Sequence, residues 1–269
     1  MDFWKLQGTG NDFILIDNRD KSIKDLAALA KSICHRRFGV GADGLIATQN
    51  SDLADIGMVY FNSDGSEATM CGNGLRCFAK YVYDKRILKN KEFSVETGDG
   101  IKNVTILEDD EIKSIIRLEM GKAENIKEMK VENYELIFMH LGVPHSIIFL
   151  NNAIDTDELV DLTEKLGPII ETNAAFPQGT NVNFVQLKGK NSLLVSTWER
   201  GAGRTWACGT GACASAVASH YRKIVDSDVE VEMLGGNVSI SINNNLEVFL
   251  EGPAELICKG FYLQNLFRY

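Results

Sequence analysis

The chain contains one pattern twice, and this internal repeat limits the possible fold more than any other feature. The segments ATMCGNGLRCFA (68–79) and TWACGTGACASA (205–216) each place a cysteine before a Gly-x-Gly turn that leads into a predicted helix. Three pairs of positions share a spacing of 137 residues: Asn62 and Glu199, Cys71 and Cys208, and Gly98 and Gly235. Self-similarity at a fixed spacing indicates a duplicated structural unit. We therefore expect two similar lobes.

The predicted secondary structure follows the same order in both halves. Each half opens with a glycine turn and a β-rich run, continues with helical spacing (25–34 and 157–167), and then has a short strand with a polar end. The Cys-Gly turn, a second helix and further strand-like runs follow. The second of the early helices is expected to end at Gly167-Pro168, since proline cannot continue a helix.

The helices after the two cysteines are predicted to be central. After Cys71, the residues Leu75, Phe78, Ala79 and Val82 form an i, i+3, i+4, i+7 stripe, and the helix after Cys208 is almost entirely Ala, Ser, Cys and Val. Such small residues allow strands to wrap closely around a helix. The fold class expected is α+β, with two pseudo-symmetric lobes, each a mixed β-sheet wrapped around a central helix.

The lobe boundary is expected in the polar stretch 119–134. We expect an N-terminal lobe at 1–118, to which the C-terminal segment 256–269 returns, and a C-terminal lobe at 119–255. The repeated functional ends of the lobes are expected to meet at a shared cleft that holds the active site.

Composition excludes several classes of partner. The chain has 269 residues, 45% of them hydrophobic, and a net charge of −9 without a cluster of Lys and Arg, so nucleic acid is a poor partner. It has no apolar run of signal-peptide or membrane-span length, so a cytoplasmic protein without a membrane partner is expected.

The cysteines do not form a known metal or disulfide framework. Six cysteines are spread over the chain without a Cys-x-x-Cys pair, so no metal site is expected. Cys34, Cys77, Cys213 and Cys258 are interpreted as small buried hydrophobic residues.

Cys71 and Cys208 require a different interpretation. Each directly precedes a predicted helix, where unpaired backbone N–H groups and the positive end of the helix dipole favour a thiolate. The thiol pKa is therefore expected to fall below its free value of about 8.5. The same N–H groups can hold a substrate carboxylate.

Two equivalent cysteines suit a reaction that is itself nearly symmetric. Inversion of a stereocentre is such a reaction, because one group removes a proton from one face and the other delivers a proton to the opposite face. The pattern therefore favours a racemase or epimerase that acts beside a carboxylate.

The chain resembles the diaminopimelate epimerase family over essentially its whole length. The resemblance lies in these segments: KLQGTGNDFILID, RRFGVGADGLI, FNSDGSEATMCGNGLRCFAKY, ETGDG, GVPH, GTNVNFV, WERGAGRTWACGTGACA and GPAELICKG. It implies a cofactor-independent isomerase with two catalytic cysteines, Cys71 and Cys208. It also implies the substrate contacts Asn11, Asn62, Gly72, Asn73, Asn181, Glu199, Arg200, Gly209 and Thr210, and it makes His145 and Glu199 the residues that tune the cysteine pKa values.

Three positions depart from the family pattern. Val143 stands where many members have Asn, and Gly44 stands where some have Gln, so both departures bear on substrate recognition rather than on proton transfer. Cys258 replaces a tyrosine that supports a dimer in some members, although a homodimer remains the expectation.

The leading functional hypothesis is epimerisation of LL-2,6-diaminoheptanedioate to its meso form, in lysine and peptidoglycan precursor biosynthesis, without pyridoxal phosphate. One alternative is a racemase of another amino acid, of the histidine or proline type. A second is an amino-acid binding protein in which Cys71 and Cys208 form a reversible disulfide. The binding alternative leaves Glu199, Arg200 and the helix-start glycines unexplained.

Overall fold

The structure is a computed structural model in which residues 1–263 are described. The chain divides into two compact units, residues 1–118 with the segment from Gly252 onward, and Glu119–Glu251. Residues 264–269 of the predicted returning segment 256–269 lie outside the described residues.

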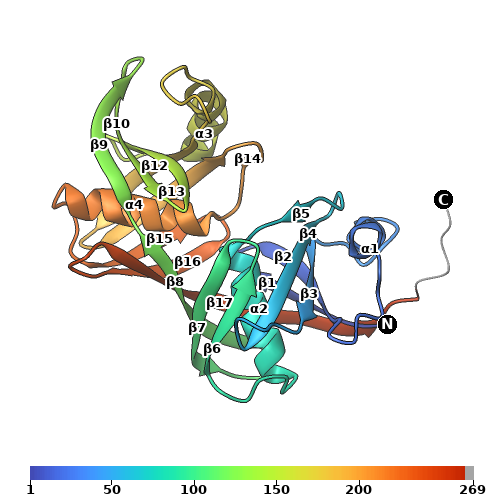
Figure 1. The fold of residues 1–269 in the computed structure, drawn as a ribbon. Helices are drawn as coiled ribbons and strands as arrows, with labels where there is room; N and C mark the ends of the chain where they lie inside the picture. Colours follow the sequence, from blue (N-terminus) through green and yellow to red (C-terminus); the bar gives the residue numbers. More distant parts are fainter. Residues whose placement is uncertain (264–269) are drawn as a thin grey trace. The chain divides into compact units, whose positions relative to one another are not determined.

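The first unit opens with a hairpin and ends with three antiparallel strands. Its elements are β1 (Asp2–Gly8), β2 (Asn11–Asp17), α1 (Leu26–Ile33), β3 (Gly44–Gln49), β4 (Ile56–Asn62), β5 (Glu67–Ala68), α2 (Gly72–Asp84), β6 (Glu92–Thr97), β7 (Gly100–Asp109) and β8 (Lys113–Lys122), the last of which runs past the unit boundary (Figure 1).

The second unit begins with an additional strand, β9, and then repeats this order of elements. Its elements are β9 (Glu124–Val131), β10 (Tyr134–Leu141), β11 (Val143–Phe149), α3 (Thr156–Glu171), β12 (Asn181–Gly189), β13 (Ser192–Glu199), β14 (Gly203–Arg204), α4 (Gly209–Tyr221), β15 (Asp228–Met233), β16 (Gly236–Ile242) and β17 (Glu247–Phe261). The first residues of β17 pair with β16, and its residues from Glu255 onward pair with β1 of the first unit's sheet.

Strand pairing confirms the duplication. In the first unit β1–β2 is antiparallel, β2–β3 parallel, β3–β4 antiparallel and β4–β6 parallel. In the second unit β10–β11, β11–β12, β12–β13 and β13–β15 repeat this sequence of directions. Both ends of α2 precede the corresponding ends of α4 by 137 residues. The predicted α+β fold with two duplicated lobes is therefore correct.

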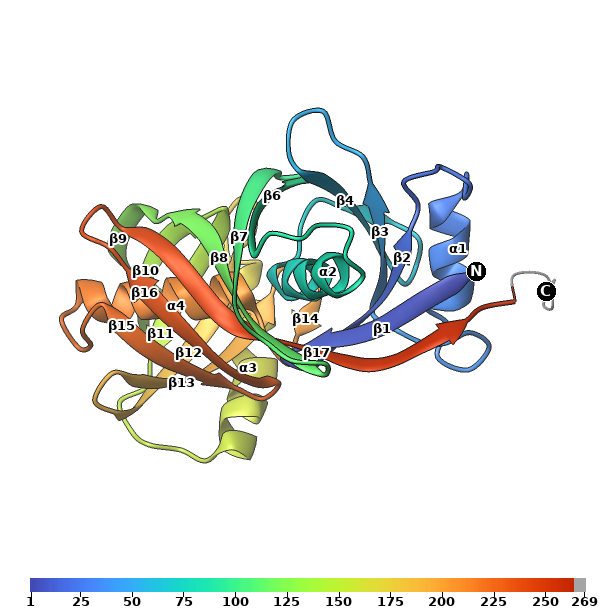
Figure 2. The same cartoon turned by 90° about the horizontal axis from the view of Figure 1, so that it is seen from below.

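Each unit is built around its second helix. Figure 2 shows α2 end-on with the strands of its unit around it, and every residue from Asn73 to Val82 is buried. In the second unit, small residues such as Ala212, Ala214 and Ala218 pack in one core with residues of β10 to β13 and β15 to β17. Because this interior is closely packed, larger side chains on α4 would have no room.

The prediction that the helix in 157–167 stops before Pro168 is wrong. Helix α3 continues to Glu171 with Pro168 inside it. Tertiary contacts hold this last turn: Trp198 Nε1 and the Gly201 N–H donate to the two Glu171 carboxylate oxygens, at 2.6 and 2.9 Å. Gly167 provides the space, since a Cβ there would lie 2.4 Å from the Trp198 side chain.

Within residues 1–263, no helix is long and apolar enough to cross a membrane. The same part of the chain contains no group of three or more His, Cys, Asp or Glu side chains that could hold a metal ion.

Candidate active site

Cys71 occupies the N-cap position of α2. Its backbone is extended (φ −141°, ψ 120°), and its carbonyl oxygen accepts the first helical hydrogen bond from the Leu75 N–H at 2.8 Å. The thiol is partly exposed and donates to Asn11 Oδ1, with 3.7 Å between sulfur and oxygen. The structure therefore brings together two residues that are 60 positions apart in the sequence.

Asn73, the second residue of α2, belongs to a buried polar cluster. The Thr9 hydroxyl donates to Asn73 Oδ1 at 3.2 Å, and Arg76 Nη2 donates to both Thr9 Oγ1 and Asn73 Oδ1 at 3.1 Å. Thr9 has a positive φ of 49°, an uncommon conformation for a β-branched residue. The fully buried Arg76 therefore ties the β1–β2 turn, which carries Asn11, to the start of α2.

Asn62 ends β4, as the polar end of a short strand was predicted to do. Its Oδ1 accepts from the Tyr60 hydroxyl at 2.9 Å, and its Nδ2 donates to Ser66 Oγ at 2.9 Å. The side chain of this predicted substrate contact is thus fixed by its own turn.

Cys208 occupies the equivalent N-cap position of α4, in a more enclosed setting. Its sulfur accepts a hydrogen bond from the Gly211 N–H at 3.3 Å and lies 3.5 Å from Thr210 Oγ1. It is only 5% exposed. The structure therefore places the predicted residues Cys208, Gly209 and Thr210 at one helix start.

The prediction of a lowered pKa is wrong for Cys208. Burial, followed by the charge of Glu199, raises the pKa of this thiol well above its usual value, although the hydrogen bonds from Thr210 and the Gly211 N–H oppose the shift. Desolvation outweighs the helix start here because the sulfur lies inside the unit rather than at its surface. Cys208 is therefore a thiol at neutral pH.

Glu199 forms a hydrogen bond with the Cys208 side chain and accepts another from the Thr205 hydroxyl at 2.6 Å. Burial raises the pKa of its carboxyl, and these two hydrogen bonds lower it. Glu199, which the resemblance implied as a residue that tunes a cysteine pKa, thus lies beside Cys208, and its charge favours the protonated thiol.

His145 lies in β11 and is fully buried. Burial, with smaller contributions from the charges of His140 and Arg200, lowers its pKa to about 3, so the ring is neutral at physiological pH. Asn183 Nδ2 lies 3.2 Å from His145 Nδ1, and Nε2 has no hydrogen-bond partner within residues 1–263. The role of His145 in tuning a cysteine pKa stays a prediction.

Asn181 and Arg200 form another pair in the second unit. Asn181 Oδ1 accepts from the Arg200 backbone N–H at 2.8 Å, and Asn181 Nδ2 donates to the Pro144 carbonyl at 3.2 Å. Arg200 Nη1 donates to the Gln178 carbonyl at 2.8 Å. The loop after β13 is thereby fastened to the start of β12.

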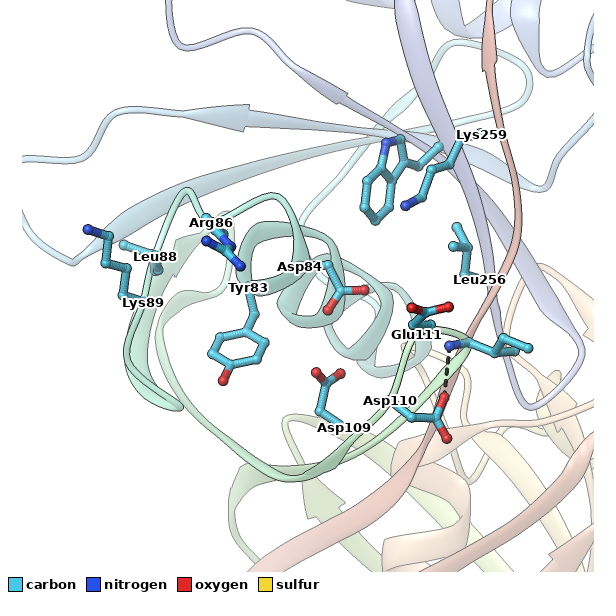
Figure 3. A pocket seen from close by; sticks show the side chains of 12 residues that line it. Tyr83, Asp84, Arg86, Leu88, Lys89, Asp109, Asp110, Glu111, Leu256 and Lys259 are labelled. Atoms are coloured by element: carbon cyan, nitrogen blue, oxygen red, sulfur yellow. Dashed lines mark hydrogen bonds between the residues drawn. The ribbon is translucent and has the colours of Figure 1, made fainter.

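A large cavity of about 1090 Å³ in the first unit is a different feature. Its lining includes Asp84, at the end of α2, together with Asp109, Glu111 and Lys259 (Figure 3). Cys71 precedes the other end of this helix, which is about 20 Å long. The cavity is therefore not part of the cysteine site.

Comparison with known proteins assigns the chain to a family. The sequence profile of one family, described as diaminopimelate epimerase, matches residues 3–126 and 137–257. The chain belongs to the diaminopimelate epimerase family. It is 43% identical over 284 aligned residues to the diaminopimelate epimerase of Alkaliphilus metalliredigens, with 99% of each chain covered. It is also 43% identical over 281 aligned residues to that of Clostridium perfringens, with 98% of this chain and 100% of the relative covered.

Solved structures show that the fold extends beyond this family. A PhzF-family phenazine biosynthesis protein from Bacillus anthracis superposes with a TM-score of 0.74 at 15% identity, covering 98% of this chain and 99% of that one. A probable proline racemase from Agrobacterium radiobacter gives 0.71 at 14% identity, covering 98% and 93%. At such identity the likeness concerns the fold alone.

The structure explains one of the three departures from the diaminopimelate epimerase pattern. At Gly44, a Cβ would lie 2.4 Å from Tyr60 Cε2 and 2.6 Å from the Phe61 carbonyl oxygen, so the tight β3–β4 pairing requires glycine. Val143 begins β11 and is half-buried, and nothing in the structure explains its presence. The interpretation of Cys258 as a small buried residue is wrong, since Cys258 is exposed on β17, opposite Lys5 of β1.

Several polar residues at the sites are missing from the sequence-based set. They are Thr9, Asp43 and Arg76 in the first unit, and Asn183, Thr197 and Thr205 in the second. Asn183 was detectable in principle, because it lies two residues after Asn181 on one strand, so both side chains point to the same face. The contacts of Arg76 join distant parts of the chain and leave no local signal.

Proposed function

We propose that this diaminopimelate epimerase family member converts LL-2,6-diaminoheptanedioate to the meso isomer, without pyridoxal phosphate, as a step in lysine and peptidoglycan precursor biosynthesis. The observation that carries the proposal is the family membership combined with two equivalent N-cap cysteines in a duplicated fold. In the proposed reaction Cys71 and Cys208 act on opposite faces of one α-carbon.

The raised pKa of Cys208 supports its assignment as the proton donor in the LL-to-meso direction. Cys71 is the more exposed cysteine and removes the α-proton as a thiolate. In the reverse direction the two roles exchange, as microscopic reversibility requires.

Helix starts suit the carboxylate at the reacting carbon. The first N–H groups of a helix have no intrahelical acceptor and lie at the positive end of the helix dipole. Gly72, Asn73, Gly209 and Thr210 are the first two residues of α2 and α4, and we assign the reacting carboxylate and amino group to these two helix starts. Negative charge that develops as the α-proton leaves is stabilised by the same groups.

The distal carboxylate is assigned to Arg200 and Asn62, with Asn11 and Asn181 as further substrate contacts. A guanidinium binds a carboxylate through charge-assisted hydrogen bonds, which is the chemistry this end of the substrate needs. We further propose that the enzyme acts in the cytoplasm as a homodimer.

Proton exchange in heavy water tests the substrate assignment. Reduced protein is incubated separately with LL-diaminopimelate, L-histidine and L-proline, and NMR follows loss of the α-proton signal. Exchange with inversion of diaminopimelate alone is expected. Exchange only with another amino acid would move the function to a different racemase, and no exchange with any of the three would favour the binding protein.

A further inference from the structure

The Asp43 carboxylate contacts the Asn11 side chain, which in turn contacts Cys71. Asn11 Nδ2 donates to Asp43 Oδ2, so the other end of the amide, Oδ1, is the end that faces the Cys71 sulfur. A carboxylate accepts hydrogen bonds and cannot donate them, which makes this orientation of the amide the favoured one.

A second set of contacts holds Asp43 itself in place. Arg36 Nη2 lies 2.6 Å from Asp43 Oδ1, and the Asp12 N–H donates to Asp43 Oδ2 at 3.1 Å. The Asp43 N–H donates to the carbonyl oxygen of Asp12 at 2.9 Å. The carboxylate that faces Asn11 is therefore fixed from two sides, although 39% of the Asp43 side chain is exposed.

We propose that Asp43 is a positioning residue that holds the Asn11 amide with its oxygen toward Cys71, and thereby favours the thiol over the thiolate at this cysteine. An amide oxygen can accept from S–H, but it repels the negative charge of a thiolate. If the amide turned over, its NH₂ group would donate to the thiolate and stabilise it. The inference rests on the proposed role of Cys71 as the base: Asp43 lowers the fraction of thiolate in the free protein, and the thiolate that is present removes the α-proton.

Other charges near this site come from β1, β2, α2 and the loop after α1. Lys5 of β1 lies 2.9 Å from the Asp12 carboxylate of β2, and Arg36 bridges Asp12 and Asp43. On α2, Arg76 contacts Thr9 and Asn73. The Asp12 side chain shares Arg36 with Asp43 but makes no hydrogen bond to the Asn11 amide within residues 1–263, so it offers a matched control of equal charge.

The test compares the ionisation of Cys71 in Asp43→Asn, Asp12→Asn and the native protein. Each protein is treated with iodoacetamide between pH 6 and 10, and alkylation is read by mass spectrometry on the tryptic peptide of residues 38–76, in which Cys71 is the only cysteine. In Asp43→Asn the amide is free to turn, and we expect the Cys71 rate at pH 7 to rise about tenfold, equivalent to a pKa about one unit lower.

The Asp12→Asn control separates the effect of the Asn11 amide orientation from the effect of removing a nearby negative charge. The Asp12→Asn rate is expected to stay within about twofold of the native rate, since a difference of one pKa unit is a factor of ten. Equal increases in both variants would overturn the proposal, because loss of a nearby negative charge would then explain them. An unchanged rate in Asp43→Asn would also overturn it.

A measurement on the native protein covers the case in which Asp43→Asn does not fold. The side-chain NH₂ of Asn11, assigned in ¹⁵N NMR spectra by comparison with Asn11→Ser, is expected to exchange with solvent at least tenfold more slowly than the exposed amide of Asn244. Equal exchange rates would overturn the proposal. Because neither experiment contains substrate, both outcomes are independent of the diaminopimelate assay.

Discussion

At the residue scale, the two cysteines hold equivalent positions in different surroundings. The Cys71 thiol donates to a neutral amide oxygen and is partly exposed, whereas the Cys208 thiol is buried beside the Glu199 carboxyl. A symmetric fold thus carries an asymmetric pair of acid–base groups, which a reaction with distinct proton donor and acceptor requires.

Glu199→Gln is predicted to lower the pKa of Cys208. The substitution removes the charge that, after burial, contributes most to raising this pKa, so thiolate forms at a lower pH. Titration of ¹³Cβ-labelled cysteine by NMR measures the shift, with the Cys208 signal assigned from Cys208→Ser. The control is Glu171→Gln, which removes a carboxylate bound to Trp198 in the same unit. Equal pKa values of Cys208 in the two variants would contradict the prediction.

Because His145 is buried and neutral, the protein is predicted to lose stability in acid. The pKa of His145 is about 3 in the folded protein and about 6.5 in the unfolded chain, so below pH 6.5 the unfolded state binds a proton that the folded state does not. The contribution of neutral His145 to the free energy of unfolding is complete above pH 6.5. It falls by about 2 kcal/mol at pH 5 and is lost as the pH approaches 3.

Urea unfolding of native protein and His145→Gln at pH 7.5, 6 and 5 measures this contribution. Other titrating groups are common to both proteins, so their difference isolates His145. The free energy of unfolding of the variant should fall less steeply with decreasing pH. Parallel profiles would show that His145 does not supply the effect.

At the element scale, the start of α4 depends on a glycine that the sequence presents only as part of a turn. A Cβ at Gly211 would lie 2.4 Å from Asn183 Oδ1 and 2.9 Å from Thr197 Oγ1, whereas at Gly209 the nearest atom, Leu250 Cδ1, is 3.5 Å away. The two glycines of one Cys-Gly-x-Gly turn therefore have different structural requirements.

Gly211→Ala is accordingly predicted to destabilise the protein by about 1–3 kcal/mol, as overpacking in a closely packed interior does. Gly209→Ala should leave stability nearly unchanged and serves as the matched control. Chemical denaturation followed by circular dichroism measures both, and equal losses would refute the packing explanation.

The helices and strands also show which features could be predicted from the sequence. Cysteine positions, helix starts and strand ends follow from local pattern, and Cys71, Cys208 and Asn62 lie where the pattern placed them. The extension of α3 through Pro168 depends on Trp198 and Gly201, which come about 30 residues later. Likewise, the pKa of Cys208 depends on burial, which the tertiary fold decides. Long-range contacts account for these two errors.

At the scale of the whole molecule, the duplication of the fold matches the near symmetry of the proposed reaction. Two units with the same strand order each present a cysteine at the start of a buried central helix. In the proposed mechanism one cysteine serves each face of the α-carbon, so the proton removed and the proton delivered are held on different sulfur atoms.

The isotope content of substrate and product early in the reaction tests this claim most directly. Reduced protein converts LL-diaminopimelate in heavy water, and the reaction is stopped after a few per cent turnover. The account predicts deuterium at the inverted carbon of every meso molecule and almost none in the remaining LL isomer, because an abstracted proton can return only from the sulfur that removed it. Deuterium entering the LL isomer as fast as the meso product would contradict it, since a single base would then serve both faces.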